Sequence, residues 1–503
     1  MKLNYRRTIL VGFAFFLISA FWQAYDATIP VILTNKFGMS QTWSGVIMAL
    51  DNILAVFMLP IFGALSDKCK SPKGKRTPFI TIGTIIASIA LVSLSFVDSI
   101  QLNNVSDVAA IDDPAALAVI YDKQADTTLY TPEGDEFVLR DVFTKDDFVN
   151  ITTQVTLPSG EKIANTDYAN YVAPARQACA AAATAQQPVP LILFVVLLLS
   201  VLISMAIFRS PAVALMPDVT IKPLRSKANA IINLMGTAGG ILVLVLGIVF
   251  ATSAVKNSMM SYILYYGVIA AVMLGALAIF KLTVKETKWA AEMQAESVRL
   301  GIDESEPVDQ GEKRRLTGPE KRSLILILAS IALWYIGYNA VTSKYSLYAS
   351  SVLGMDYNST LLLAQAAAII SYLPAGIVLL TSAFALASFM RVGSSAALMN
   401  VLFAMAGIGW ATINVNSFPM VVEMCSGADI GKYTGYYYTA SMTAQIITPM
   451  LSGYLMDLTK TMTILFPYAA IFVALAFVTM WFVKHGDAKP ESKKGLAALD
   501  IDD

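Results

Sequence analysis

Three ionisable residues stand out inside long apolar stretches of this chain, where a charge is costly to bury. Asp26 and Asp51 lie roughly 10–12 Å from the ends of two consecutive apolar runs, if each run is a helix. Two carboxylates at similar depth on adjacent antiparallel helices can share one proton, because like charges at close range disfavour each other. Such a pair suits proton coupling, but each carboxylate can equally cap a local helix break or face a wet cavity without coupling.

Arg209 lies in a fourth apolar run, about eight residues from its opposite end at helical spacing. A buried guanidinium requires an acidic partner or a solute, and its planar fork suits carboxylates and hydroxyls. The competing interpretation is an arginine whose stem is buried while its charge reaches the membrane surface.

The apolar runs that hold these residues are long enough to cross a membrane. Of the 503 residues, 56% are hydrophobic and 14% charged, against roughly a quarter charged in soluble domains. Runs of about 20 apolar residues cross the hydrocarbon layer as helices, so we predict an all-α membrane protein. The predicted segments are 8–33, 43–65, 78–97, 190–216, 228–252, 260–284, 323–349, 359–390, 397–421, 434–455 and 462–483.

The polar intervals divide the chain into parts. We predict a first half of six helices over 1–284, a polar linker over 285–322, a second helical half over 323–484 and a tail over 485–503. The first half carries an acidic insertion, 98–189. Its short apolar runs between Phe137 and Leu157 indicate either a small β-containing cap or a disordered segment.

Basic residues gather in two loops of the first half. These are Lys68, Lys70, Lys73, Lys75 and Arg76 after the second helix, and Lys222, Arg225 and Lys227 after the fourth. Positively charged loops stay in the cytoplasm. We therefore expect a multi-pass protein of the plasma or bacterial inner membrane with both termini cytoplasmic and the insertion outside.

The first basic loop, Gly63 to Pro78, has an order of residues that can form a conformational latch. Glycine lets a neighbouring helix approach, and an acid there can pair with a cation or accept hydrogen bonds from a helix N-terminus. An ordinary basic loop is the alternative. The latch candidates, including charges at other cytoplasmic helix ends, are Gly63, Asp67, Lys68, Gly74, Lys75, Arg76, Asp218, Arg225 and Glu423.

This loop, followed by Pro78-Phe79-Ile80, resembles the signature of major-facilitator sugar symporters of the glycoside-pentoside-hexuronide group, especially their sucrose-transporter-like branch. The stretches 208–218, 225–230 and 435–445 are also similar to that branch. The resemblance implies twelve transmembrane helices in two halves and proton-coupled uptake of a mono- or disaccharide by alternating access. It also implies that Arg209 belongs to the substrate or coupling network.

Sodium-coupled relatives carry carboxylates further along the second helix, where this chain has Ala55 and Leu59 among apolar residues. The proton is therefore the expected coupling ion.

Sugar recognition requires amides that match hydroxyls and an aromatic face. For any single candidate, hydrogen bonding or packing between helices is the alternative role. The stretch Tyr338-Asn339-Ala340 repeats Tyr25-Asp26-Ala27 at the corresponding place in the other half. The substrate candidates are Trp22, Tyr25, Asn52, Asn229, Asn233, Tyr338, Asn339, Gln365, Asn414 and Gln445.

The second half is shorter than the first. The run 359–390 is shorter than the roughly 40 residues that two full helices need, and no charge interrupts it. One kinked helix would invert everything that follows, so we predict two shortened helices, eight and nine, joined near Pro374–Gly376. A deletion there would leave a transport-defective variant.

The sequence holds no nucleophile–base pair, phosphate loop or metal-ligand spacing, so we expect neither an enzyme nor a cofactor or metal. A formal net charge of zero gives no reason to expect nucleic acid. The expected partners of a monomer are the bilayer, a proton and a small solute such as a sugar. Alternatives are a facilitator or exporter of another solute, or a receptor that senses solute through the insertion.

Overall fold

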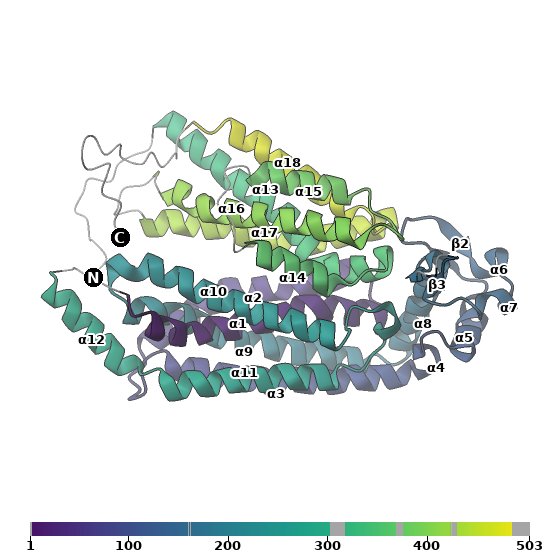
Figure 1. Cartoon of the computed structure of the whole chain (residues 1–503), viewed down its shortest axis with the longest axis horizontal. Helices are drawn as coiled ribbons and strands as arrows, with labels where there is room; N and C mark the ends of the chain where they lie inside the picture. Colours follow the sequence, from purple (N-terminus) through teal and green to yellow (C-terminus); the bar gives the residue numbers. More distant parts are fainter. Residues whose placement is uncertain are drawn as a thin grey trace.

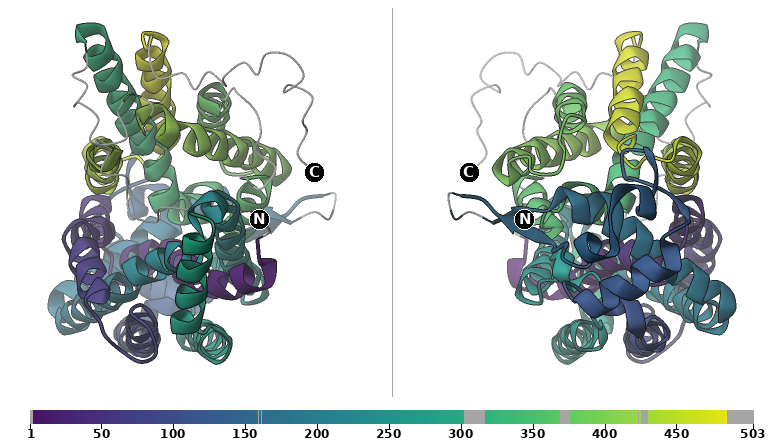
Figure 2. Two further views of the ribbon diagram at one scale, coloured as in Figure 1. Left: turned by 90° about the vertical axis from the view of Figure 1, so that its left-hand side faces the viewer. Right: turned by 90° about the vertical axis from the view of Figure 1, so that its right-hand side faces the viewer.

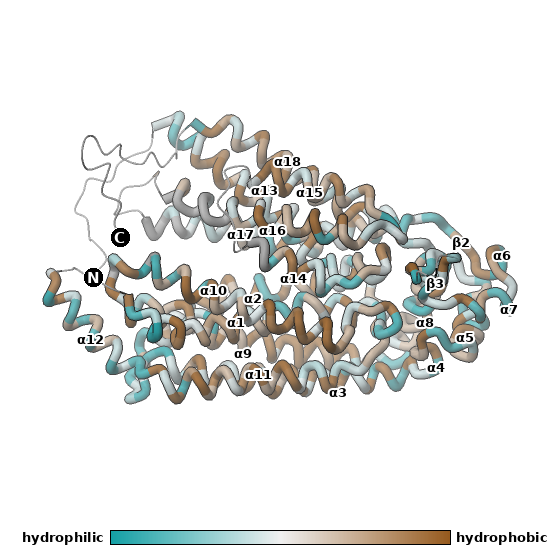
Figure 3. The backbone as a smooth tube through the Cα atoms, in the orientation of Figure 1, coloured by the Kyte–Doolittle hydropathy of each residue, from teal (hydrophilic) through white to brown (hydrophobic). Residues whose placement is uncertain are grey.

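The structure is a computed structural model, and it describes residues 3–158, 160, 162–301, 317–368, 376–422, 424 and 430–484. Within these residues, eight helices are long and apolar enough to cross a membrane, and shorter apolar helices accompany them. The prediction of an all-α membrane protein is confirmed. Hydrophobic residues cover the middle of the long helices, and hydrophilic residues gather at their ends (Figure 3).

The first half contains one helix for each of its six predicted segments. They are α1 (Tyr5–Asn35), α2 (Gln41–Asp67), α3 (Thr77–Asn104), α9 (Val189–Val219), α10 (Arg225–Val249) and α11 (Ile263–Thr283). Short 3-10 turns, η2 (Lys222–Leu224) and η3 (Val255–Asn257), lie in its loops.

Helix α3 is longer than the segment 78–97 predicted from the sequence. It continues through Asp98 to Asn104, so the first residues assigned to the insertion are helical. Asp98 does not end the helix because its carboxylate binds the Lys36 ammonium at 2.7 Å, and both side chains are 0% exposed. The predicted segment ended at 97 because Asp98 is charged. The ion pair with Lys36 neutralises that charge, so the helix can continue.

The second half has the expected helices, two of them short. They are α13 (Gly318–Tyr348), which continues into the π-helical turn η4 (Ala349–Leu353), then α14 (Tyr357–Ala368), α15 (Gly376–Ala387), α16 (Ala396–Val422), α17 (Ile430–Thr459) and α18 (Leu465–Trp481).

Helices α14 and α15 confirm the prediction of two shortened helices in place of one. Each has 12 described residues, and both lie within Tyr357–Ala387, which is fewer than the roughly 40 residues that two full spans need even with the undescribed 369–375 included. At the start of α14, Asn358 Nδ2 donates to Thr252 Oγ1. After α15, Arg391 pairs with Glu133 of the insertion. The pair therefore begins and ends at the same face, while the predicted junction at Pro374 lies outside the described residues.

The insertion folds into a cap beyond the helix ends, which we define as residues 105–187 (Figure 1). Its elements are α4 (Ser106–Ala109), α5 (Pro114–Gln124), β1 (Thr128–Tyr130), β2 (Glu136–Val138), α6 (Leu139–Val142), α7 (Lys145–Phe148), β3 (Gln154–Thr156), β4 (Lys162–Ala164), the π-helical turn η1 (Tyr168–Val172) and α8 (Ala173–Gln186). The strands form two antiparallel hairpins, β1–β2 and β3–β4. Leu117, Phe148 and Val172 share a core of the cap. Of the two sequence interpretations, the structure has the β-containing cap.

The two halves have separate hydrophobic cores and lie side by side (Figures 1 and 2). The loops that hold the basic residues, together with helix α12 (Glu286–Arg299) from the interval 285–322, lie at the end opposite the cap. We call these ends the basic end and the cap end. Residues 302–316 of the linker and the tail from 485 lie outside the described residues.

Candidate solute site between the two halves

A cavity of about 610 Å³ lies between the two halves. Helices α1, α9 and α10 line it from the first half, and α13 to α16 line it from the second. A smaller cavity of about 190 Å³ shares Trp22, Asp26, Arg209 and Asn339 with it and extends toward α2 and α17. The two spaces therefore form one candidate site whose walls belong to both halves.

The three ionisable residues singled out from the sequence come together on one wall. Asp26 and Arg209 line both cavities, and Asp51 lines the smaller one. The Arg209 guanidinium carbon lies 5.6 Å from the centre of the Trp22 ring. Asp51 accepts hydrogen bonds from the backbone N–H and side-chain Nδ2 of Asn52, at 2.6 and 2.7 Å. The two carboxylates and the guanidinium thus face a common space rather than lipid.

Most of the predicted substrate residues line the same space. The larger cavity contains Trp22, Asn233, Tyr338, Asn339 and Gln365, and the smaller one adds Asn52 and Gln445.

Two predicted substrate residues with described side chains, Tyr25 and Asn229, line neither cavity. Tyr25 is 2% exposed and packs in the core of the first half, where its ring contacts Trp22 edge-on with centroids 5.4 Å apart. Asn229 is exposed on α10 and lines neither cavity. The side chain of Asn414 lies outside the described part of the chain.

Two buried donors at the cavity have no hydrogen-bond partner among the described residues. They are Trp22 Nε1, from the first half, and Asn339 Nδ2, from the second. A buried donor without an acceptor costs about 1–3 kcal/mol. A solute that offers oxygen acceptors here would remove that cost on both sides of the cavity at once.

Two residues of the site were missed from the sequence. The Trp410 ring stacks on Tyr338 with centroids 3.7 Å apart and an interplanar angle of 0°. Gln365 Nε2 donates to Gln23 Oε1 across the two halves. Gln23 is an amide within an apolar run, so it meets the criterion by which the other amides were selected as substrate candidates. Nothing in the sequence distinguishes Trp410 from aromatic residues that only pack between helices.

The halves are held together at the cap end by a polar cluster that the sequence did not indicate. Lys344 Nζ of α13 donates to the backbone oxygen and Oε1 of Gln41, at 2.7 and 3.1 Å. Asp457 of α17 accepts from the backbone N–H groups of Gln41 and Thr42, at 3.0 and 2.8 Å, and from Thr42 Oγ1. A carboxylate from one half thus caps the N-terminus of α2 in the other.

Close backbone contact accompanies these hydrogen bonds. A Cβ at Gly45 would collide with the backbone of Pro449, and one at Gly453 with that of Gln41. Helices α2 and α17 therefore approach closely on the cap side of the cavity.

At the basic end, the predicted latch centres on Arg76. Its guanidinium pairs with Asp67 at 2.5 Å and Asp218 at 2.7 Å, and donates to Ser66. Burial alone would lower the pKa of Arg76, but the two carboxylates outweigh it and raise that pKa. Asp67 accordingly pairs with a cation, and the arginine joins the ends of α2, α3 and α9.

Glu286, at the start of α12, caps α3. Its carboxylate accepts from the backbone N–H of Arg76 at 2.9 Å, and from the N–H and Oγ1 of Thr77 at 2.8 and 2.7 Å. The sequence assigned this residue to a linker. Its role depends on a contact across more than two hundred residues of chain, which no local pattern reveals.

The remaining latch candidates have other surroundings. A Cβ at Gly63 would lie 2.9 Å from Ser210 Oγ of α9, so α2 and α9 are close there. Arg225 donates to the backbone oxygens of Pro217 and Thr220 at the end of α9. Lys68 and Lys75 are exposed and form no ion pair with a described residue. Glu423 lies outside the described residues.

Replacing Gly74 by alanine is expected to destabilise the latch. Gly74 has φ +111°, and a Cβ there would collide with the Glu286 carboxylate. The left-handed backbone alone costs alanine about 1 kcal/mol, and the collision adds about 1–3 kcal/mol. Gly393→Ala is the matched control, because Gly393 has φ +82° with open space around it. Free energies of unfolding from SDS titrations should fall more for Gly74→Ala; equal losses would contradict the packing role of Gly74.

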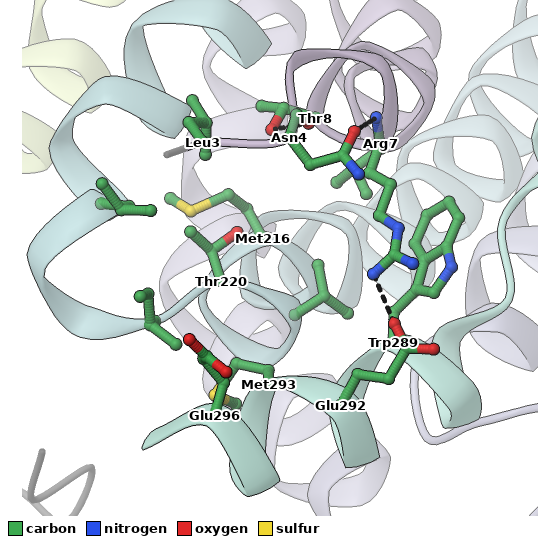
Figure 4. Close-up of a pocket in the computed structure, with 14 residues that line it drawn as sticks. Leu3, Asn4, Arg7, Thr8, Met216, Thr220, Trp289, Glu292, Met293 and Glu296 are labelled. Carbon is green, nitrogen blue, oxygen red and sulfur yellow. Dashed lines mark hydrogen bonds and ion pairs between the residues drawn. The ribbon is translucent and has the colours of Figure 1, made fainter. Parts of the chain in front are cut away.

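A separate surface cavity of about 270 Å³ lies at the basic end between α1, α9 and α12 (Figure 4). Its charges are already paired: Arg7 Nη1 binds Glu292 Oε2 at 2.6 Å, and the Arg7 guanidinium lies 5.2 Å from the Trp289 ring centre. Glu296 pairs with Arg299. Since it lies within the first half and α12, this cavity is not lined by both halves.

Comparison with known proteins agrees with this architecture. The model of the Major Facilitator Superfamily matches residues 2–112. The sucrose transport protein SUC3 of Arabidopsis thaliana is 37% identical over 67 residues, which are 13% of this chain and only 11% of that relative's length.

Solved structures match over nearly the whole chain. The inward open conformation of the xylose transporter XylE from E. coli superposes with a TM-score of 0.56 at 15% identity, covering 99% of this chain and all of that one. A point mutant of the nucleoside transporter NupG gives a TM-score of 0.53 at 14% identity, covering 95% of this chain and all of that one. The chain is an integral, multi-pass helical membrane protein with the fold of the major facilitator superfamily.

Proposed function

We propose that this protein is a secondary active transporter that couples uptake of a mono- or disaccharide to proton entry by alternating access. The observation that carries the proposal is the cavity between the halves, where Asp26, Asp51 and Arg209 meet. A site formed by both halves can face either side of the membrane in turn, if the halves rock about it.

A sugar suits the lining of this cavity. The unpaired donors of Trp22 and Asn339 offer hydrogen bonds to hydroxyl oxygens, and the stacked rings of Tyr338 and Trp410 provide an apolar wall. Amides of Asn233 and Gln365 add groups that both donate and accept. This mixture of a few polar groups on an aromatic surface is typical of small-molecule sites.

Coupling would use the acids of the same wall. Asp51 is held by Asn52 beside the space that also contains Arg209. Protonation of Asp51 removes a negative charge near Arg209. The guanidinium is then more available to bind the solute. Proton binding and sugar binding are thereby linked through one arginine.

Uptake by the purified protein in proteoliposomes tests the proposal. Radiolabelled sugars from a panel of mono- and disaccharides should accumulate when the outer pH is below the inner pH, and should only equilibrate without a gradient. If no sugar is exchanged but another solute is, the protein transports a different substrate on the same fold. Sugar flux that ignores the pH gradient would identify a facilitator.

We propose further that the basic end is cytoplasmic, since positively charged loops remain on that side. Cys69 lies partly exposed in the first basic loop, whereas Cys179 is buried in the cap. Burial raises the pKa of the Cys179 thiol, so less thiolate is present to react.

In a Cys425→Ser background, a membrane-impermeant maleimide is expected to label Cys69 only after the cells are opened. Cys179 should stay unlabelled until the protein is denatured. Labelling of Cys69 in intact cells would place the basic end outside and overturn the orientation. The variant Cys69→Ser identifies the labelled thiol, because its signal in opened cells should disappear.

A further inference from the structure

The cap contains a buried arginine with unused hydrogen-bond donors. Arg176 of α8 is 4% exposed. Its Nη1 donates to the backbone oxygens of Val108 and Ala110, whereas Nε and Nη2 have no hydrogen-bond partner among the described residues. No described carboxylate forms an ion pair with it. A buried charge that is neither paired nor fully hydrogen-bonded is costly, so these donors require an acceptor.

A small cavity lies beside this guanidinium. It has a volume of about 50 Å³, enough for a few water molecules or one small anion, since one water needs roughly 10–15 Å³ by this measure. Four parts of the chain form its wall: the end of α1, the cap, the segment before α11, and η4 of the second half with the residue after it. Polar side chains on the wall include Asn35, Thr153, Tyr168, Ser258, Ser350 and Ser351.

The other groups at this cavity favour an anion. Burial raises the pKa of Tyr168, although the charge of Arg176 and hydrogen bonding between the two side chains oppose the shift, so the Tyr168 hydroxyl stays protonated next to the guanidinium. The nearby acid, Asp112, is already used: it accepts from the backbone N–H and Oγ1 of Thr153 at 2.7 and 2.8 Å. The cavity therefore offers a positive charge and the hydroxyls of Tyr168, Ser258 and Ser351, while the hydroxyls of Thr153 and Ser350 donate to other oxygens.

We propose that this cavity binds one small monovalent anion of halide size, held by Arg176 Nε and Nη2, and that the anion fastens the cap to the second half. The cap contacts that half at other places as well. Pro132 O accepts from Met462 N at 2.9 Å and from Thr461 Oγ1 at 2.8 Å, and Gly354 lies so close to Ala164 that a Cβ would overlap it. Because the cap and the second half both contribute residues to the wall of the cavity, an anion bound there stabilises the contact between them.

Bromide is the probe for the site, because it replaces chloride and scatters anomalously. Crystals of the full chain grown in sodium bromide are expected to show an anomalous peak beside Arg176. An ordered water without anomalous signal at that position would overturn the proposal.

Thermal unfolding in detergent gives a second readout. At equal ionic strength, the wild-type midpoint should be higher in sodium bromide than in sodium gluconate, whose anion is too large for the cavity, because a ligand of the folded state stabilises it. Arg176→Gln should unfold at the same temperature in both salts. Arg140→Gln removes an exposed arginine of the cap that pairs with Asp126, and it should keep the wild-type response to bromide.

A variant that fills the cavity distinguishes loss of the anion from the other effects of removing Arg176. Ser258→Leu fills the space from the segment before α11 and leaves the guanidinium intact, so it too should lose the response to bromide, even if Arg176→Gln does not fold. Equal wild-type midpoints in the two salts, or a bromide response that Ser258→Leu retains, would contradict an anion at this place.

Discussion

Sugar uptake driven by a pH gradient is expected to fall to the level measured without a gradient when Asp51 is replaced by Asn, while exchange of sugar across the membrane continues. The amide keeps the shape of the side chain, and its oxygen can still accept the N–H of Asn52 that Asp51 binds at 2.6 Å. It cannot take up or release a proton in this range of pH. The loss should therefore concern coupling and leave the sugar site in place.

Two measurements on proteoliposomes separate these effects. The first is accumulation of labelled sugar under an inwardly directed proton gradient, and the second is counterflow, in which a sugar gradient drives exchange without any pH difference. Asp51→Asn should fail in the first and pass the second. Asp141→Asn, at an exposed position of α6 in the cap, is the matched control and should behave as wild type in both. If Asp51→Asn still accumulates sugar under a pH gradient, Asp51 is not the coupling residue. Asp26→Asn should be assayed in parallel, because Asp26 is then the candidate.

Replacing Arg209 by lysine is expected to weaken sugar binding while the protein still folds. Lysine keeps the positive charge beside Asp51, but it loses the planar fork that can donate two parallel hydrogen bonds and stack on an aromatic ring. Arg209 lies over Trp22 with 5.6 Å between the guanidinium carbon and the ring centre. Loss of one charge-assisted hydrogen bond costs about 1.5–3 kcal/mol, which corresponds to roughly a 10- to 150-fold weaker affinity.

The measurement is the concentration of sugar that half-saturates counterflow, together with direct binding by calorimetry in detergent. In Arg209→Lys, the half-saturating sugar concentration and the dissociation constant from calorimetry should rise by a similar factor, since the lost interaction is with the bound solute. Arg7→Lys provides the control, because Arg7 lies in the separate cavity at the basic end and pairs with Glu292. An Arg209→Lys protein with wild-type affinity would show that the guanidinium does not contact the solute.

The sequence by itself determined the features that a membrane makes visible along the chain. Charged residues inside apolar runs are rare because their burial is costly, so Asp26, Asp51 and Arg209 were identified before any contact was known, and all three line the cavity. The shortage of residues near Pro374 predicted two short helices, since the length of a span follows from the thickness of the bilayer. These inferences need only local composition and helical rise.

Only the tertiary structure decided which face of each helix is turned to the cavity. In lipid both the packed face and the lipid face of a helix are apolar, so the periodicity that marks the buried side of a soluble helix is lost. The sequence accordingly placed Tyr25 beside Trp22 as a substrate residue, although Tyr25 packs into the core. For the same reason it gave no signal for Trp410, whose role follows from its stacking on Tyr338.

Contacts between distant segments were also decided by the tertiary structure. Glu286 caps α3, Lys344 and Asp457 join the halves around Gln41, and Arg176 meets a wall supplied by the second half. From their sequence neighbours, Glu286 was assigned to a linker, Lys344 to an apolar run and Arg176 to an acidic insertion, while Asp457 fell between two predicted runs. The actual partner of each lies far along the chain, and a hydrogen bond depends on geometry in space, which composition and spacing do not contain.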